Sequence, residues 1–421
     1  MSDRAVVSGL GFVGAVGCGR QALARALEAG TPSVRPIEPL ERLHRSGIPL
    51  FAASSGDADL SPWLDPRKAR RMSPPSKYAV TAAKMALDDA GLDVSDLDDA
   101  LGEEARQGEA LGVVLATSFG PSSFTERLLD QIVLQGPEAA SPFLFTESVA
   151  NAPAAQVALT FGARGANLTL TQREAGPLLA LARGAQEVRR GRLRCALVLA
   201  VDEVTPLLHG VLARYGALTS FDGGATPLPL DHRRDGYLLA GGAAVAVVEA
   251  ESEVHRRGGR ILARIGQAVR AFDPRARRTD WSRDPDFLSN ALQRAWARTG
   301  RTPQDFDLIV SGAAGTISGD RLEAGILRKV WDGASHPPVL IPKAVTGEFG
   351  GGFLASAVLA AAGAPFGAPA VGSEPDPDLG ISPHPGSPLP PPARLLATSL
   401  APGGAAAWVE LEAGDPQPHE G

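Results

Sequence analysis

The sequence has few cysteines, few aromatic residues and no long apolar run. Two of its 421 residues are cysteine, Cys18 and Cys195, which lie far apart. This spacing excludes a disulfide framework and a cysteine-based zinc site, and it favours a reducing, cytoplasmic setting. No apolar stretch approaches the roughly 18 residues of a membrane span, so we predict none. The first residues also lack the regions of a signal peptide, and we expect no such segment.

Positive charge is not in excess either. The chain has 41 Lys and Arg against 47 Asp and Glu, a formal net charge of -6. This balance provides no general basic surface for nucleic acid, so we predict no nucleic-acid partner. The seven histidines are scattered through loops and charged stretches. We therefore expect neither a metal site nor a bound cofactor.

Apolar segments with strand and helix character alternate along the chain, which is typical of an α/β fold whose sheet is covered on both faces. The alternation of strand and helix segments starts again after residue 255, so we predict a duplicated fold with halves at residues 1–255 and 256–421. In the first half we expect strands at 5–9, 111–116, 167–171, 195–201 and 242–249, with helices at 78–90, 154–161 and 176–191. In the second half we expect strands at 261–266, 308–312, 339–342, 395–397 and 407–411, with helices at 285–299, 320–331 and 352–362.

A glycine pattern, GLGFVG, follows the first strand at residues 9–14. It matches the GxGxxG turn that places backbone N–H groups against a pyrophosphate. A dinucleotide site also needs an acidic residue at the end of a second strand about 20 residues later. Here Glu28 lies in a helical pattern instead. We therefore interpret the glycines as a structural turn.

Several longer motifs resemble the β-ketoacyl-ACP synthases, the condensing enzymes of fatty acid and polyketide synthesis. They occur in the family's order, from residue 5 to about residue 411. The blocks are AVVSGLG at 5–11, YAVTAAK at 78–84, NAPAAQVA at 151–158, PLDHRRDGY at 229–237, TISGDRLEA at 316–324 and KAVTGEFGGG at 343–352. The resemblance implies a thiolase-like αβαβα layered fold built from two similar halves. It also implies a dimer.

The catalytic positions of that family are altered in this chain. The family uses a low-pKa cysteine on a sharp turn between strand and helix, and two histidines that help decarboxylate malonyl-ACP. The register places Glu174 at the cysteine, Gly312 at the first histidine and Glu348 at the second. The resemblance therefore implies that no catalytic residue is intact.

Other residues of the family's pocket are kept or replaced. Lys343 and Glu323 match a lysine and a glutamate beside the active site, and we expect them to keep an ion pair. Leu400 or Pro402 takes the place of a phenylalanine that gates acyl entry. Glu174 and Glu348 would also bring two carboxylates together, which raises one pKa unless Lys343 or a neighbouring arginine compensates.

A helical stripe between residues 124 and 134 contains Phe124, Leu128, Leu129, Ile132 and Val133, of which Phe124, Leu128 and Ile132 are the main candidates. Core packing is one interpretation of such a stripe. The other is a dimer interface that shapes the acyl tunnel of a partner, which makes these residues candidates for setting chain length.

Members of the family without the cysteine include the chain-length factors, or ketosynthase β subunits, of type II polyketide synthases. Similarity to them implies a non-catalytic subunit that pairs with an active ketosynthase α subunit. The heterodimer would act on acyl carrier protein with a phosphopantetheine-bound acyl chain. The non-catalytic subunit would help set the length of that acyl chain. Two alternatives stay open. One is an enzyme of altered chemistry, a malonyl decarboxylase or hydrolase using Glu174 and Glu348. The other is a protein that captures acyl chains without a ketosynthase.

Overall fold

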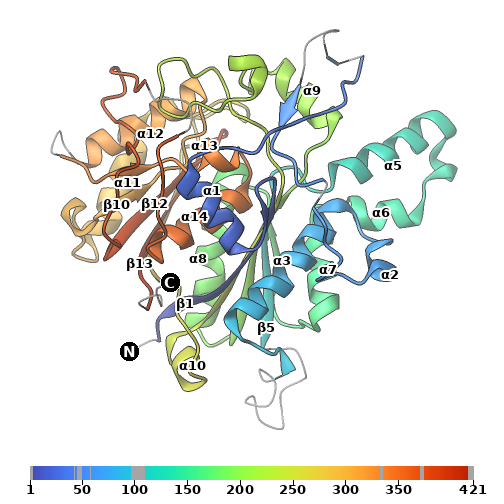
Figure 1. The fold of residues 1–421 in the computed structure, drawn as a ribbon, viewed down its shortest axis with the longest axis horizontal. Coiled ribbons are helices and arrows are strands. Elements are labelled where there is room, and N and C mark those ends of the chain that lie inside the picture. Colours follow the sequence, from blue (N-terminus) through green and yellow to red (C-terminus); the bar gives the residue numbers. More distant parts are fainter. Residues whose placement is uncertain are drawn as a thin grey trace.

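The computed structural model of the chain describes residues 3–41, 43–44, 50–56, 58–95, 110–331, 335–369 and 374–415. Ten strands form one hydrogen-bonded path through this part of the chain, and a short strand, β2 (Gly17–Cys18), pairs with β1 beside it. Strands and helices alternate around the path, which confirms the predicted α/β class (Figure 1).

The first five strands of the path occupy the N-terminal part of the chain. From the free edge inward they are β6 (Asn167–Leu170), β5 (Leu111–Ala116), β7 (Cys195–Asp202), β8 (Gly242–Ala250) and β1 (Ala5–Gly14). The pairs β6–β5 and β5–β7 are parallel, whereas β7–β8 and β8–β1 are antiparallel. Because β5, β6 and β7 run in the same direction, their carboxyl ends meet at one edge of the sheet.

The C-terminal strands repeat this order. From the other edge inward they are β11 (Val339–Leu340), β10 (Leu308–Val310), β12 (Arg394–Leu400), β13 (Ala405–Ala413) and β9 (Ala263–Phe272). Again the two outer pairs are parallel and the two inner pairs antiparallel. β1 and β9 join the two sets. The repeat supports the division near residue 255, which stays a prediction.

Helices lie between and outside the two sets of strands. In the middle layer α8 (Gly176–Arg189) contacts α14 (Gly350–Ala361), and both pack against strands of both sets. On the outer faces lie α3 (Pro74–Ala90) and α7 (Ala152–Phe161) on one side, and α11 (Pro285–Ala297) and α12 (Ile317–Val330) on the other. This is the five-layer αβαβα arrangement that the sequence predicts.

Further elements complete the described fold. They are α1 (Arg20–Ala29), β3 (Arg35–Pro36), β4 (Phe51–Ala52), α2 (Pro66–Ala69), α5 (Ser122–Gln135), α6 (Pro142–Ser148), α9 (Pro206–Arg214), α10 (Glu251–Arg256) and α13 (Lys343–Thr346). Four 3-10 turns are Pro137–Ala139, Arg173–Ala175, Phe221–Gly224 and Pro303–Asp305. Among the described helices, none combines the length and the apolar composition that crossing a membrane requires.

The glycine pattern at residues 9–14 is not a turn, contrary to the expectation. β1 continues to Gly14, and all ten of its residues are buried. A Cβ on Gly9 would lie 2.2 Å from the carbonyl oxygen of Ala86, and a Cβ on Gly11 would lie 1.9 Å from that of Ala82. The glycines are there because α3 packs against the strand at backbone distance.

Candidate functional site

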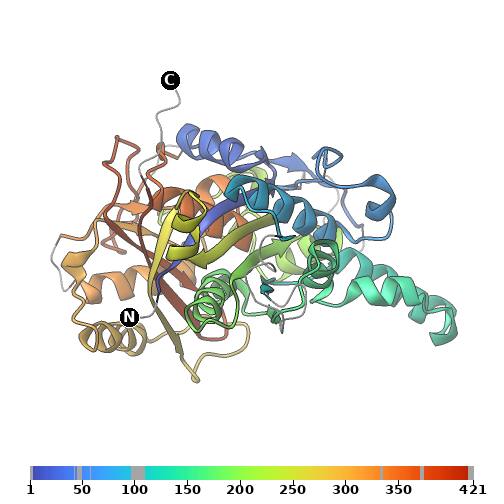
Figure 2. The ribbon, with the colours of Figure 1, turned by 90° about the horizontal axis from the view of Figure 1, so that it is seen from below.

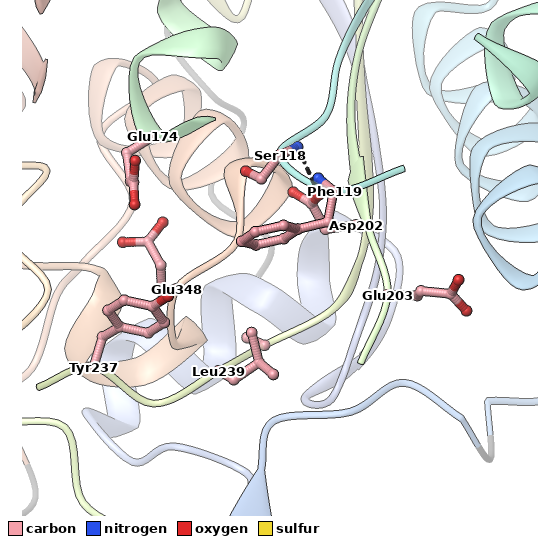
Figure 3. A pocket seen from close by; sticks show the side chains of 9 residues that line it. Ser118, Phe119, Glu174, Asp202, Glu203, Tyr237, Leu239 and Glu348 are labelled. Atoms are coloured by element: carbon pink, nitrogen blue, oxygen red, sulfur yellow. Dashed lines mark hydrogen bonds between the residues drawn. The ribbon is translucent and has the colours of Figure 1, made fainter. Parts of the chain in front are cut away.

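A nearly filled cavity of about 10 Å³ lies at the carboxyl ends of the three parallel strands (Figure 3). Ser118 and Phe119 come after β5, the turn after β6 carries Glu174, and Asp202 is the last residue of β7. Tyr237, Leu239, Ala240, Glu203 and Glu348 complete the lining. Ligand sites of α/β sheets lie at this edge, because loops from several strands converge there. We therefore take this cavity as the candidate site.

Glu174 lies on a tight turn between β6 and α8. The preceding residue, Arg173, has a φ of 48°, a left-handed value that is rare for a residue with a side chain. Such strain is concentrated at functional sites. The Arg173 guanidinium lies 3.3 Å from Glu174 Oε1 and 5.6 Å from the centre of the Phe119 ring. The N-terminus of α8, which follows directly, also favours a negative charge here.

The second carboxylate oxygen of Glu174 is different. Oε2 is buried and has no hydrogen-bond partner among the described residues, and the whole residue is only 7% exposed. Figure 3 shows the carboxylates of Glu174 and Glu348 facing one another across the cavity. The two positions are 174 residues apart in sequence, and the structure brings them into one small space.

Glu348 forms a buried ion pair with Lys343. The Lys343 ammonium is 2.7 Å from Glu348 Oε2 and donates a hydrogen bond of 2.9 Å to the carbonyl oxygen of Gly312. The lysine side chain is 2% exposed. Burial raises the pKa of Glu348 to about 7, although Lys343 lowers it; the charge of Glu174 adds to the rise. The nearby ammonium therefore compensates the crowding of the two carboxylates only in part.

Glu323 has other partners than the sequence suggests. Its Oε1 accepts hydrogen bonds from the Ser311 hydroxyl at 2.6 Å, from the Gly312 N–H at 3.1 Å and from the Thr398 hydroxyl. Burial raises its pKa to about 7, against the effect of these hydroxyls. The expected ion pair with Lys343 is wrong, because Lys343 pairs with Glu348. Glu323 instead fixes the backbone after β10 to the end of β12.

Gly312 leaves no room for a side chain. A Cβ at this position would lie 2.6 Å from the carbonyl oxygen of Thr398 and 3.1 Å from the Cα of Ser399. An imidazole at position 312 therefore requires the backbone of β12 to move. The carbonyl of Gly312 serves as an acceptor for the lysine, so this position contributes only backbone to the site.

The two replacements for the gating phenylalanine lie outside the cavity. Leu400 ends β12 and is buried in the hydrophobic cluster of the C-terminal half, with Trp408 and Leu396. Pro402 is half-buried in the turn between β12 and β13. The neighbouring Ser399 does reach the site, since its hydroxyl donates to the carbonyl oxygen of Glu174 at 2.5 Å.

The candidate chain-length residues lie on an arm, which we define as α5 and α6 (residues 122–148). Both views show this arm projecting from the body of the molecule (Figure 1, Figure 2). Phe124 and Leu128 are each 8% exposed and pack with Leu144 of α6, while Ile132 is half-buried against them. The structure thus places these three residues of the stripe in the internal core of the arm. The other two residues of the stripe, Leu129 and Val133, are exposed. Leu134, Phe143 and Phe145 are exposed as well and were not predicted as candidates.

The sequence analysis also missed most of the cavity lining. Asp202 accepts hydrogen bonds from the backbone N–H groups of Ser118 and Phe119, at 2.8 and 3.3 Å. Burial raises its pKa to about 6 against these bonds. Burial, followed by the charge of Glu174, raises the pKa of the Tyr237 hydroxyl. The adjacent acids Asp202 and Glu203 at the end of an apolar strand were a usable signal, because charged residues there face the ligand edge of the sheet.

No group of three or more His, Cys, Asp or Glu side chains within the described residues is placed to hold a metal ion. Two ion pairs, Arg173–Glu174 and Lys343–Glu348, hold the two facing carboxylates of the site, and Asp202 and Glu203 add two further acids to its lining.

Comparison with known proteins gives concordant results. The model of a family described as "Beta-ketoacyl synthase, N-terminal domain" matches residues 2–254. The chain is 30% identical over 348 residues to the tetracenomycin polyketide synthase ketoacyl synthase beta subunit of Streptomyces glaucescens, covering 82% of this chain and 81% of that protein. It is 25% identical over 355 residues to the chloroplastic 3-oxoacyl-acyl-carrier-protein synthase I of Arabidopsis thaliana, covering 82% and 72%.

A solved structure gives the same result for the fold. The structure titled "The ishigamide ketosynthase/chain length factor" matches this chain with a TM-score of 0.84 at 26% identity. The match covers 98% of this chain and 100% of that one.

Proposed function

Because the chain belongs to the β-ketoacyl synthase family, we propose that it is a non-catalytic subunit that pairs with an active ketosynthase. In this role it stabilises the ketosynthase and helps set the length of the chain carried by an acyl carrier protein. The strongest support is the acidic side chain of Glu174 on the strained turn between β6 and α8, at the position that the motif register assigns to the family's cysteine.

A glutamate carboxylate cannot replace a cysteine thiolate as the group that carries the acyl chain. A thiolate that attacks an acyl thioester forms another thioester, which is stable enough to hold the acyl chain until condensation. A carboxylate would form a mixed anhydride, which water hydrolyses readily. Decarboxylation of malonyl-ACP needs hydrogen-bond donors for the developing enolate. At the two positions that the motif register assigns to the histidines, this chain has Gly312, which contributes only backbone, and Glu348, whose carboxylate is bound to Lys343.

The size of the cavity supports the same proposal. A space of about 10 Å³ is close to the least that one water molecule needs. An acyl chain therefore has no room beside Glu174 in this conformation. Phe119, over which the Arg173 guanidinium lies, is one of the side chains that narrow this space.

Two features of the surface suit a subunit that works in a pair. The strand β6 is the last in its set, and no other strand of the described residues pairs with its outer edge, which is a ready template for another chain. The arm carries exposed apolar side chains on its outer face, such as Val133 at 77% and Phe145 at 61%. Exposed apolar groups of this kind mark interaction surfaces. Relatives named as a beta subunit and as a ketosynthase/chain length factor support the choice of partner.

Co-expression tests the proposal. We would produce the chain alone and together with a ketosynthase that has the intact Cys-His-His set, supply each with acyl- and malonyl-carrier protein, and follow the proteins by intact mass. The expected result is a stable heterodimer in which only the ketosynthase becomes acylated and product forms. Acylation and chain extension by the isolated chain would overturn the proposal.

An enzyme of altered chemistry is the second candidate, and one observation favours it. Glu348, with a pKa of about 7, faces the unpartnered oxygen of Glu174, an arrangement that suits proton transfer near neutral pH. The double variant Glu174→Gln/Glu348→Gln separates the candidates. A hydrolase or malonyl decarboxylase loses its activity, whereas a helper subunit supports the same product yield as before.

Chain-length control has its own test. Phe124 and Leu128 shape the arm from inside, while Leu129 and Val133 lie on its outer face. Replacing Phe124 or Leu128 by a residue of different bulk should alter the distribution of product lengths made by the heterodimer. An unchanged distribution with intact heterodimer contradicts the role of this arm.

A further inference from the structure

A broad groove of 1110 Å³ opens beside the free edge of β6. Residues of β6, α8, β9 and β13 line it. Its floor is apolar, with Leu178 and Leu179 from α8 facing Val269 and Val409 from the strands. The groove is thus continuous with the unpaired strand edge, because Leu168 to Leu170 belong to both.

The strand edge itself is incompletely satisfied. Within the described residues β6 pairs on one side only, with β5, so its other side presents free backbone groups. The hydroxyl of Thr169 on this strand is buried and has no hydrogen-bond partner. A second chain that adds a strand here would satisfy the edge and cover the groove at the same time.

The rim of the groove has charge of one sign. We define the rim as Arg183, Arg189, Arg190 and Arg270. No Asp or Glu is among the residues that line the groove. Arg183 is neutralised by Glu187 at 3.1 Å, and Arg189 donates to the backbone carbonyls of Ile265 and Gly266. Arg190 and Arg270 are exposed, and neither has an ion pair with any residue that the structure describes.

These charges bear on which chain can occupy the groove. In a two-fold dimer joined at the β6 edges, each copy presents the same surface to the other near the axis. Two copies of this chain would place positive rim against positive rim, and like charges brought together disfavour a complex. A partner with carboxylates at the matching place would instead gain attraction.

We propose that the arginine rim selects the partner: it disfavours pairing with a second copy of this chain and favours a ketosynthase whose facing surface is acidic. This inference rests on the proposed function and adds to it the surface used and the charge of the partner. The occupant of the groove is therefore the ketosynthase, and a second copy is the competing outcome.

Charge reversal tests both sides of the inference. The variant Arg190→Glu/Arg270→Glu changes the two rim arginines that have no partner. In the first experiment, sedimentation measures the self-association of the unmodified chain and its association with this variant. We expect the mixed pair to form at least about tenfold more tightly than the unmodified homodimer. We also expect salt at about 0.5 M to reduce this difference, because exposed charges are screened.

The second experiment measures the affinity of the ketosynthase for each form of this chain. Its affinity for the rim variant should fall by about tenfold relative to the unmodified chain. A matched control, Arg25→Glu/Arg298→Glu, makes the same change in net charge at two exposed arginines that do not line the groove. This control should bind the ketosynthase as the unmodified chain does and should not promote mixed pairing.

The outcomes distinguish the two levels of the proposal. If no form of the chain binds a ketosynthase, the proposed function fails. The first experiment still shows whether the rim arginines disfavour pairing with a second copy. If the unmodified chain dimerises as tightly as the mixed pair, or if the rim variant binds the ketosynthase like the control, the role of the arginines is refuted.

Discussion

Replacing Glu348 by glutamine should change how the stability of the protein depends on pH. The carboxyl group is buried against Lys343 and faces Glu174, and its pKa in the folded chain is about 7 instead of the ordinary 4.5. Glutamine has the same shape as the protonated carboxyl group and can still accept a hydrogen bond from Lys343. The substitution therefore removes one titration and leaves the packing in place.

The sign follows from the direction of the shift. An acid whose pKa is higher in the folded state binds protons more tightly there, so stability falls as pH rises from the unfolded pKa to the folded one. With values of 4.5 and about 7, ionisation of Glu348 costs about 0.8 kcal/mol at pH 5 and about 3.3 kcal/mol at pH 8. The glutamine variant avoids this cost. Its stability relative to the unmodified protein should thus rise by about 2.5 kcal/mol between pH 5 and pH 8.

Urea unfolding of both proteins at each pH measures this difference, and the titrating groups that do not interact with position 348 cancel because both proteins contain them. A control variant, Glu28→Gln, changes an exposed glutamate on α1 and should give a difference below about 0.5 kcal/mol at every pH. A flat difference for Glu348→Gln, or one that falls with pH, refutes the reasoning that the carboxylate is held in the cavity at a desolvation cost.

Three further changes have expected outcomes. Lys343→Met leaves Glu348 as a buried carboxylate without its partner, so unfolding free energy at pH 8 should drop by about 3–5 kcal/mol, and by less at pH 5. Gly312→Ala places a Cβ 2.6 Å from the carbonyl oxygen of Thr398 and should cost about 1–3 kcal/mol in urea unfolding. Glu147→Ala removes a buried acceptor of two hydrogen bonds from the start of α3 and one from Gln156 of α7, and hydrogen exchange at the start of α3 should accelerate by about tenfold or more.

These changes have matched comparisons. Gly56→Ala adds a methyl group where the nearest atom, the Ser54 hydroxyl oxygen, is 3.5 Å away, so its effect on unfolding should be small. For Glu147, exchange at the C-terminal end of α3 near Gly91 should stay unchanged if the loss is confined to the first turn. Equal losses for Gly56→Ala and Gly312→Ala contradict the packing argument. For Lys343→Met, a stability loss that is the same at pH 5 and pH 8 contradicts the charge argument.

Much of the fold was accessible from periodicity. The buried strand at residues 111–116 was predicted with its observed bounds, and the helices that became α8, α11 and α14 were placed within a few residues. Runs of apolar residues with glycine or proline at their ends report local structure well, because strand and helix periods differ. β1 was underestimated, since glycine normally interrupts a strand and only the close approach of α3 explains its presence.

The site was accessible in part. Motif register identified Glu174, Gly312 and Glu348, since each follows a recognisable segment. The pairing of Lys343 was predicted wrongly because it depends on competition that the sequence does not display. Glu323 is already bound by two hydroxyls and a backbone N–H, which leaves the ammonium to Glu348.

The sequence by itself determined the order of strands and helices, and its motif register predicts a carboxylate at the family's cysteine position, because both depend on residue type and short-range spacing. Tertiary structure alone decided that Glu174 and Glu348 face one another in a space of about 10 Å³, and that Phe124 and Leu128 turn into the arm while Leu129 turns outward. It also decided that two exposed arginines line the groove to which β6 contributes. The reason is that contacts between distant segments are fixed by how helices pack on strands, and small differences in that packing select the partner of each charge.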